Sequence, residues 1–393
     1  MKTFKQYEGY AQVTAILPRQ STGRVLQAVL NDGASNVLTL NARGSMVKDR
    51  WYQSFLPTLS AEQEMISFLA PIEEADPLME QIVMEGNLQL FGAGAIYATH
   101  CGSFLCSDDY PLWSPGDYTF ESVSFDIRFS RNLVAVMQIT DKGQADGIAR
   151  AAIRTGAPGP TISYIRGYGL RDRLGLLRIT KTHEKELVTL VLDKYDVDAV
   201  FQAMAEAGSV DQPGKGIIYQ LPIAKGLTNL ASVFSAQRHS ASIQQIVHAI
   251  DQIQGDTKWR ANQLLIHDPK ANEFQDRRKG TISDLVMLNV LCHRKDAEGL
   301  LYQALNSGAP GASLSNWRFT EGNSEQTSGG LRINREFGCL SFLLQEDLVE
   351  TLQEQLCETI SDRDLKQTCL YTHSIPTIRT YSSSALSEAE KGQ

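Results

Sequence analysis

Two glycine-rich segments of this sequence contain the residue types that bind phosphate groups. Glycines let backbone N–H groups approach phosphate oxygens closely, and concave arrays of such amides bind anions. A lysine adds a point charge to those oxygens, and a nearby arginine adds a second cation. The two segments lie at residues 166–171 and 213–219. Their candidate phosphate-binding residues are Gly167, Gly169, Arg171, Gly214, Lys215 and Gly216.

Both segments also have an ordinary structural interpretation. Glycine pairs are common in turns, where they supply backbone conformations that other residues avoid. Arg171 and the neighbouring Arg173 can equally be solvated loop charges. His183, Glu184 and Glu186 have the residue types of a metal or acid–base set, but they fall in an expected polar connector. The phosphate-binding interpretation therefore needs support from the fold.

Two other groups of residues contain side chains that could be chemically active. Basic residues at 238–240 and 258–260 either form an anion-binding edge or, through Trp259, anchor a linker to the core. No nucleophile-elbow sequence supports a hydrolase triad. The residues with the types that such a triad requires are Ser103, His100 and Asp108.

Composition and charge exclude several classes of protein. The chain has 393 residues, 42% hydrophobic and 21% charged, which is ordinary for a globular protein and long enough for two to four domains. A formal net charge of −8 argues against a general nucleic-acid binder, but not against a small anionic ligand. The sequence starts without the apolar core of a signal peptide and has no spanning apolar run, so we expect a cytoplasmic protein. We expect its six cysteines to be reduced thiols.

The same landmarks occur three times along the chain. A Gly-Ala pair recurs at separations of 123 and 152 residues, and a tyrosine recurs at separations of 122 and 152. Two independent landmarks with nearly the same spacing indicate duplication. The landmark glycines are Gly33, Gly156 and Gly308, and the tyrosines are Tyr97, Tyr219 and Tyr371.

The second copy contains the clearest series of expected elements. Its order β-α-β-β-α-β is that of a ferredoxin-like unit, and the other two copies fit the same order. We therefore predict an α+β fold in which three ferredoxin-like repeats form an intrachain pseudo-trimer. The expected strands of the second copy are 133–139, 161–165, 186–192 and 216–222, with helices after Asp141 and at 197–207.

These boundaries divide the chain into five expected parts. The linker between the second and third repeats includes a helix at 242–253. The parts are a first repeat at 9–101, a second at 133–225, the linker at 226–283, a third repeat at 284–376 and a flexible tail at 377–393.

With these elements in place, the second copy resembles the PII signal-transduction family over about residues 133–223. The resemblance is carried by the Gly-aromatic-Gly turn after the second strand, the Gly-Lys loop before the fourth and the helix phrase at 197–200. It implies a PII-like regulator, as in nitrogen regulation, with an adenine nucleotide (ATP, ADP or AMP, with or without Mg) as effector in an inter-repeat cleft. The nucleotide-contacting positions that it implies are Gly167, Gly169, Gly214, Lys215 and Gly216.

The resemblance also implies a protein that has no catalytic activity and no catalytic cofactor. Ligand occupancy would change the order of a loop and hence the binding of a regulated protein, with a membrane transporter's cytoplasmic face as one candidate. We expect no nucleic-acid partner. We also expect a monomer or dimer, because a chain that contains three repeats needs fewer copies.

The sequence departs from the family pattern at several places. Leu170 stands where the family has arginine, the loop from Gly169 to Glu186 is short, and the Arg-rich stretch after the fourth strand is absent. Ala93 in the first copy and residues 366–368 in the third replace the Gly-Lys-Gly of the second. These losses favour an alternative, an interaction scaffold with decayed ligand sites. An enzyme is a third hypothesis, but no nucleophile, metal cluster or carboxylate pair supports it.

Overall fold

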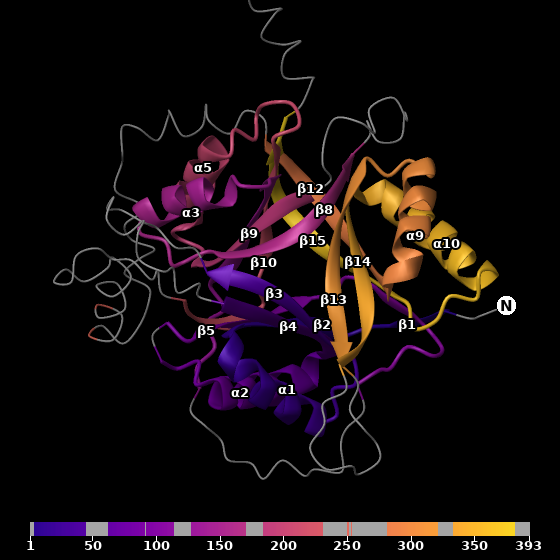
Figure 1. Ribbon diagram of the computed structural model, residues 1–393, viewed down its shortest axis with the longest axis horizontal. Coiled ribbons are helices and arrows are strands. Elements are labelled where there is room, and N and C mark those ends of the chain that lie inside the picture. Colours follow the sequence, from indigo (N-terminus) through magenta and orange to yellow (C-terminus); the bar gives the residue numbers. More distant parts are fainter. Residues whose placement is uncertain are drawn as a thin grey trace, which may run out of the picture.

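The computed structural model describes most of the chain (Figure 1). Arg171, Arg173 and His183 fall outside the described ranges, as does nearly all of the predicted helix at 242–253. The described residues are 4–44, 62–90, 92–113, 127–169, 184–230, 250, 253, 281–320 and 333–381.

The chain folds as three successive series of elements, which we call the first, second and third segments. The first segment comprises β1 (Phe4–Tyr7), β2 (Tyr10–Pro18), α1 (Arg19–Asn31), β3 (Val37–Gly44), β4 (Glu62–Pro71), α2 (Ile72–Gly86), β5 (Gly94–His100) and β6 (Phe104–Ser107). The second comprises β7 (Leu133–Asp141), α3 (Ala145–Arg154), β8 (Thr161–Gly169), β9 (Glu184–Asp193), α5 (Val197–Ala207), β10 (Gly216–Pro222) and β11 (Lys225–Asn229). The third comprises β12 (Thr281–His293), α9 (Arg294–Asn306), β13 (Gly311–Thr320), β14 (Ile333–Gln345), α10 (Glu346–Asp362) and β15 (Cys369–Thr380).

The strands carry apolar side chains on both faces, which explains why both faces are buried. In β7, Val136 packs among the helices of its segment, whereas Ala135 faces the interior of the molecule. Successive side chains of a strand point to opposite faces, so apolar residues on both faces require cover on both. Helix α3 covers the outer face with Ile148 and Ala152. Gly156, with φ +93°, follows the end of that helix and turns the chain back towards the sheet.

The predicted fold class, α+β with three ferredoxin-like repeats in an intrachain pseudo-trimer, is wrong. The strands do not form three separate sheets but one sheet of 15 strands, and every pairing between them is antiparallel. Nine of these strands close into a barrel in the order β15-β10-β7-β9-β8-β3-β13-β14-β12. The physical reason lies at β3, β8 and β13, which would be open edges in isolated units. Unpaired edge groups favour pairing, and these three strands pair with one another.

The last strand of each segment pairs with a strand of another segment, and these pairings also join the three segments into one sheet. Strand β6 of the first segment pairs with β15 of the third, and β11 of the second pairs with β5 of the first. The end of β15 pairs with β10 of the second segment. Thus β11 lies within the stretch predicted as a linker, and β15 continues to Thr380, into the stretch predicted as a tail.

The hydrophobic core has an outer part and an inner part. Figure 1 shows the helices outside the sheet in three pairs, α1 with α2, α3 with α5, and α9 with α10. Each pair covers a cluster of side chains from its own segment. One inner cluster combines residues of all three segments, among them Ile16, Tyr219 and Ile375. A second inner cluster, which includes Tyr371, combines residues of the first and third segments. None of the helices in the described ranges is both long enough and apolar enough to cross a membrane.

Candidate anion-binding site

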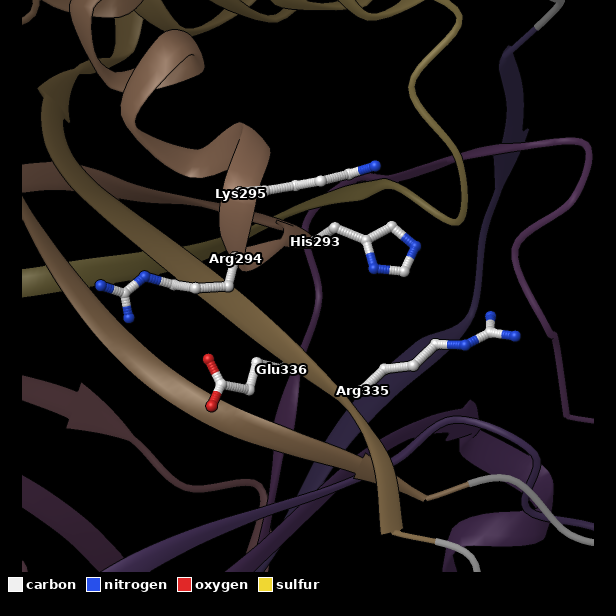
Figure 2. Close-up of a pocket in the computed structure, with 5 residues that line it drawn as sticks. All are labelled: His293, Arg294, Lys295, Arg335 and Glu336. Atoms are coloured by element: carbon white, nitrogen blue, oxygen red, sulfur yellow. The ribbon is translucent and has the colours of Figure 1, made fainter.

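A pocket of about 450 Å³ that is open to solvent, which we call the cavity, lies in the third segment where β12 and β14 meet the first turn of α9. Its residues Lys295, Arg335 and Glu336 are exposed. Figure 2 shows the five side chains that line it, of which four are basic and one is acidic. The lining residues are His293, Arg294, Lys295, Arg335 and Glu336. Sequence reasoning did not select any of them.

The strand-to-helix junction places these residues together. His293 is the last residue of β12, and α9 begins directly after it, without an intervening loop. Opposite it in the sheet is Phe337 of β14, which brings the preceding residues Arg335 and Glu336 beside the helix start. The first N–H groups of a helix have no partner within the helix, and His293 forms no side-chain cap for α9. Buried Leu300 and Leu301 hold the helix against the sheet.

The charges in the cavity are divided between two sides. In the view of Figure 2, the side chains of His293, Lys295 and Arg335 extend to one side. The side chains of Arg294 and Glu336 extend to the other. An anion is therefore attracted to the first side, where no carboxylate is among the lining residues.

His293 is the titratable group between the two cations. Its ring lies 4.6 Å from that of Phe337, centroid to centroid. Burial lowers the pKa of His293 below 6.5, and the nearby Arg335 and Lys295 lower it further, whereas Asp296 and Asp109 act in the opposite direction. At neutral pH the ring is therefore mostly neutral, and a bound anion would favour its protonated form.

Arg335 connects the cavity to the strand exchange between the first and third segments. Its Nη1 donates a hydrogen bond to Oε1 of Gln367 at 2.7 Å. The backbone N–H of Gln367 donates to Oδ1 of Asp109 at 3.1 Å, and Ser107 Oγ donates to the same oxygen at 2.7 Å. Ser107 is the last residue of β6, so this chain of hydrogen bonds runs from the cavity to the strand that pairs with β15.

The equivalent positions of the other two segments are joined by an ion pair. In the first segment, Arg19 at the start of α1 pairs with Glu62 at 2.9 Å. In the second, Lys142 pairs with Glu184 at 2.8 Å. The corresponding residues of the third segment are Arg294 and Glu336, at the same separations of 123 or 122 and 152 residues.

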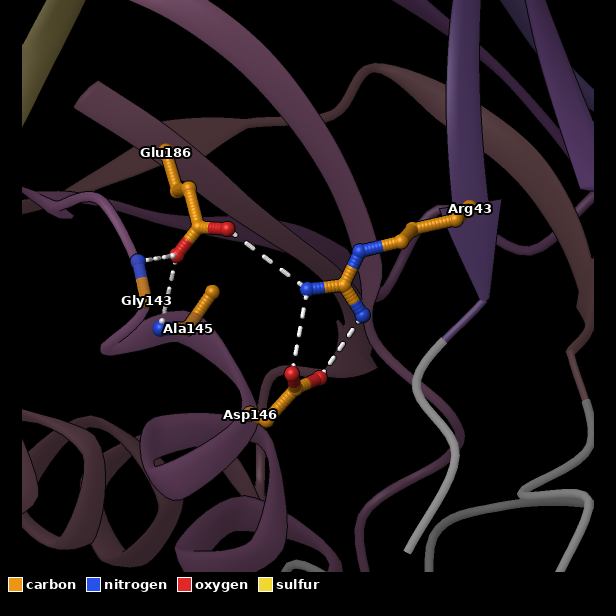
Figure 3. A network of polar contacts seen from close by, with 5 residues as sticks. All are labelled: Arg43, Gly143, Ala145, Asp146 and Glu186. Atoms are coloured by element: carbon orange, nitrogen blue, oxygen red, sulfur yellow. Dashed lines mark hydrogen bonds and ion pairs between the residues drawn. The ribbon is translucent and has the colours of Figure 1, made fainter. Parts of the chain in front are cut away.

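A second polar cluster joins the first and second segments (Figure 3). Arg43 of β3 forms two hydrogen bonds to the carboxylate of Asp146 in the first turn of α3, at 2.7 and 3.2 Å. It also lies 3.6 Å from Oε1 of Glu186, which is 3% exposed. Oε2 of Glu186 accepts hydrogen bonds from the backbone N–H groups of Gly143 and Ala145, at 2.8 and 3.0 Å. Because every charge in this cluster has a partner, it joins segments and offers no open ligand site.

The structure does not bring the two predicted glycine-rich segments together. Gly167 and Gly169 lie within β8 and pair with Ser313 and Gly311 of β13. Gly216 is the first residue of β10, and the exposed Gly214 and Lys215 form the turn before it. Strands β9 and β7 lie between β8 and β10, which corresponds to about 14 Å at the usual spacing of strands.

Gly216 has a structural reason to be glycine. Its φ is +128°, and a Cβ atom there would lie 1.9 Å from the backbone oxygen of Ile139. Gly94 occupies the same place in the first segment, with φ +139° and the backbone oxygen of Ile16 2.1 Å from such a Cβ. The close approach of two backbones therefore accounts for these glycines without a ligand.

The other groups considered from the sequence have structural partners. Glu184 pairs with Lys142, and Glu186 binds the start of α3. Ser103 Oγ accepts a hydrogen bond from Gln353 and contacts Thr372, so it does not form a triad with His100. Within the described ranges, no three His, Cys, Asp or Glu side chains are grouped so that they could hold a metal ion.

The sequence does contain a signal for the cavity, namely basic residues that the third copy has gained. The comparison of the copies in the sequence considers only lost glycines, and by that measure the third copy has lost the phosphate-binding residues. Where the first copy reads Pro-Arg-Gln at 18–20 and the second Asp-Lys-Gly at 141–143, the third reads His-Arg-Lys at 293–295. Comparison of the copies for gained charge would have found this position.

Comparisons with known proteins assign no family to the chain. No family model and no curated protein matches it. Among solved structures, aspartate kinase from Synechocystis matches with a TM-score of 0.19 and 9% identity, over 95% of this chain and 52% of the kinase. The chain thus spans about half the length of that protein. The regulatory subunit of aspartate kinase from Thermus thermophilus matches with a TM-score of 0.18 and 13% identity, over 53% of this chain and 97% of that subunit.

A third solved structure, an anthrone oxidase-like protein, matches with a TM-score of 0.16 and 11% identity, over 58% of this chain and 100% of that protein. Similarities at this level carry no argument about function. The expected link to nitrogen regulation and the description as ferredoxin-like tandem repeats are corrected here: no match supports the first, and the barrel replaces the second.

Proposed function

We propose that this protein is a regulator without catalytic activity that binds one small anionic effector in the cavity of the third segment. The observation that supports this proposal is the charge of the cavity, whose lining residues include three cations, Arg294, Lys295 and Arg335, and one anion, Glu336. Backbone N–H groups at the start of α9 add to the attraction for an anion. This local charge is opposite in sign to the net charge of −8 on the chain.

Adenine nucleotides are the effector class to test first, as ATP, ADP or AMP with or without Mg. A volume of about 450 Å³ is within the range of about 300–1,000 Å³ that is usual for small-molecule sites. The guanidinium of Arg335, whose Nη1 donates to Gln367, can add its charge to a contact with phosphate, and Lys295 can act as a point charge beside it.

The position of the cavity supports the further proposal that the protein signals to a regulated protein. Ligand contact with Arg335 would act on Gln367 and, through it, on the end of β6. A ligand changes an equilibrium between conformations only if it binds them with different affinities. We propose that this strand exchange is the element that the effector biases in a PII-like manner. We also propose that the protein acts in the cytoplasm, consistent with six cysteines that are all free thiols.

An interaction scaffold is the second candidate function. It is favoured by the separation of the predicted glycine-rich segments and by the structural role of Gly216. On this hypothesis the cavity is a solvated surface depression, and no effector binds it.

Calorimetric titration with ATP, ADP, AMP and cyclic AMP, with and without magnesium, tests the proposal. We expect saturable binding near one site per chain for at least one nucleotide. The double variant Lys295→Gln and Arg335→Gln should weaken it by more than about tenfold, because two charge-assisted contacts are lost.

Two matched variants make this test specific. Lys142→Gln removes the equivalent lysine-sized cation at the start of the second segment's first helix and should leave binding unchanged. Lys215→Ala removes the cation predicted from the sequence and should also leave it unchanged. Absence of saturable binding, or binding that the double variant does not weaken, would overturn the proposal in favour of the scaffold.

A further inference from the structure

We propose that the cavity recognises a ligand that carries both an anionic group and an amino group that donates hydrogen bonds. The anionic group would lie against His293, Lys295 and Arg335, and the amino group would lie against the carboxylate of Glu336. This inference rests on the proposed function and specifies the chemistry of its effector.

The first observation is that an ion pair present in two segments is absent from the third. Arg19 with Glu62 and Lys142 with Glu184 are in contact across the start of their helices. Arg294 and Glu336 occupy the same positions, but no ion pair joins them in the described structure, and both line the cavity. The third segment is therefore open where the other two are closed by their own charges.

The second observation is that, within the described structure, Glu336 also forms no ion pair with Arg318, the residue opposite it on the neighbouring strand. Glu336 lies opposite Arg318 in the pairing of β14 with β13. The guanidinium of Arg318 is instead directed to the first segment, where it donates to Asn41 Oδ1 at 2.7 Å and to the buried carboxylate of Glu64. The carboxylate of Glu336 is thus available to a ligand. An ionised carboxylate accepts hydrogen bonds and cannot donate them, so the group that it binds must be a donor.

The third observation is the division of charge inside the cavity. The side chains of Lys295, His293 and Arg335 extend to one side and those of Arg294 and Glu336 to the other (Figure 2), so the second side is the one that contains a carboxylate. A ligand with an anionic group alone would satisfy the first side and bring negative charge near Glu336. A ligand with an amino group at its other end satisfies both sides, because an unpaired polar group in a binding site reduces affinity.

Two sources supply this chemistry, an amino-substituted nucleotide and an α-amino acid. Each can be tested with a pair of compounds that differ only in the amino group. AMP and purine riboside 5′-monophosphate differ by the presence or absence of the amino group on the base. Glutamate and glutarate differ by the presence or absence of the amino group. The pair that shows discrimination identifies the source.

The test is calorimetric titration of the full chain with all four compounds, for the unsubstituted protein and for Glu336→Gln. We expect the amino member of one pair to bind about tenfold or more tightly than its partner. We expect Glu336→Gln to remove that preference while anion binding remains, since its amide can both donate and accept. Glu184→Gln, the matched substitution in the second segment, should leave the preference intact.

The outcomes separate this inference from the proposed function. Equal affinities within both pairs, with binding still lost in the Lys295→Gln and Arg335→Gln double variant, would overturn the inference and leave an anion site. A preference that persists in Glu336→Gln would also overturn the inference, because a group other than Glu336 would then recognise the amino group. Failure of all anions to bind would overturn the proposed function itself.

Discussion

At the scale of single residues, burial decides how the two histidines of the third segment titrate. His373 is 2% exposed, and its Nδ1 donates to the backbone carbonyl of His100 at 2.9 Å. Burial lowers its pKa from 6.5 to about 4, although the hydrogen bond to His100 opposes the shift. His293 is shifted in the same direction but lies in the cavity, where a ligand can reverse the shift.

Protonation of His373 should make stability depend on pH. Between pH 6.5 and 4 the unfolded chain binds a proton at this residue and the folded chain does not, so stability falls as the pH falls. A folded pKa of about 4 corresponds to a loss of about 3 kcal/mol over this range. Urea unfolding at pH 7 and pH 4.5 should show a smaller loss in His373→Gln than in the unsubstituted protein. Equal losses would contradict the assignment.

Anion binding at His293 should show the reverse trend with pH. Because its pKa is lowered in the free protein and a bound anion favours the imidazolium, binding takes up a proton and affinity should rise as the pH falls. Inorganic sulfate is the suitable probe, since its charge does not change between pH 8 and pH 5.5. The groups that also face His293 are Asp296, Lys295, Arg335 and Asp109, and His293→Gln should flatten the profile.

Substitution of Gly216 tests whether the close approach of two backbone segments requires glycine at this position. Gly216→Ala places a Cβ against the backbone oxygen of Ile139 and strains a φ of +128°, so it should cost about 2 kcal/mol or more. Gly169→Ala is the matched control, because a Cβ there meets nothing within 4 Å. Chemical unfolding of both variants gives the comparison. If Gly216→Ala is no less stable than Gly169→Ala, the close approach does not account for the glycine.

At the scale of elements, three arginines at matching positions join the strand after the first helix of each segment to another segment. Arg43 contacts Asp146 and Glu186, Arg166 lies 3.7 Å from Glu298, and Arg318 binds Glu64. The separations between the three arginines are again 123 and 152 residues. The acidic partners also occupy matching positions, because Glu298 lies 152 residues after Asp146 and Glu64 lies 122 residues before Glu186. Arg43 contacts both of these positions, whereas Arg166 and Arg318 each contact one.

These junctions should differ in strength. Arg43→Gln leaves the buried Glu186 without a charged partner, so it should lower the free energy of unfolding by about 1–3 kcal/mol. Arg166→Gln removes a pair whose two side chains are 43% and 58% exposed, so it should change stability by less than about 0.5 kcal/mol. Thermal or urea unfolding of the two variants measures the difference. Equal effects would show that burial does not set the strength of these contacts.

Local elements could be predicted from the sequence because their causes are local. The strand expected at 133–139 corresponds to β7, and Gly156 follows α3 with a positive φ as expected of a glycine after a helix. Closure of the barrel was not predictable in this way. It depends on which strand lies beside β3, β8 and β13, and the alternation of apolar residues shows only that both faces of a strand are buried.

The candidate site was missed for a different reason. Glycine-rich motifs draw attention because they are short and recognisable, yet the glycine at 216 serves the contact between β10 and β7. The cavity depends on residues from β12, α9 and β14 that are about 40 positions apart, and on the absence of an ion pair. Neither feature has a sequence motif. Only a comparison of the three copies, position by position, would indicate it.

At the scale of the whole molecule, the exchange of terminal strands makes each segment depend on the others. Strand β6 pairs with β15, β11 with β5, and the end of β15 with β10. The inner core likewise combines Ile16, Tyr219 and Ile375 from the three segments. No segment therefore has a complete sheet or a complete core of its own.

We expect the described body to unfold as one cooperative unit despite its size. Scanning calorimetry should give a single transition whose calorimetric and van't Hoff enthalpies agree. Met204→Ala, in the outer core of the second segment, should reduce hydrogen-exchange protection in β2 and β12 as well as in β7, because global opening exposes all three. Protection lost from the second segment alone would show independent units.

The ion pairs that close the first two helix starts have a consequence for how the chain would respond to its effector. Three identical open positions in a closed ring could influence one another and produce a steep dose–response curve. Arg19 with Glu62 and Lys142 with Glu184 leave one open position in the described structure. Under the proposed function, a single position per chain would have no neighbour with which to cooperate, so occupancy would rise hyperbolically with effector concentration. Such a protein would report a concentration in graded fashion and would not act as a threshold switch.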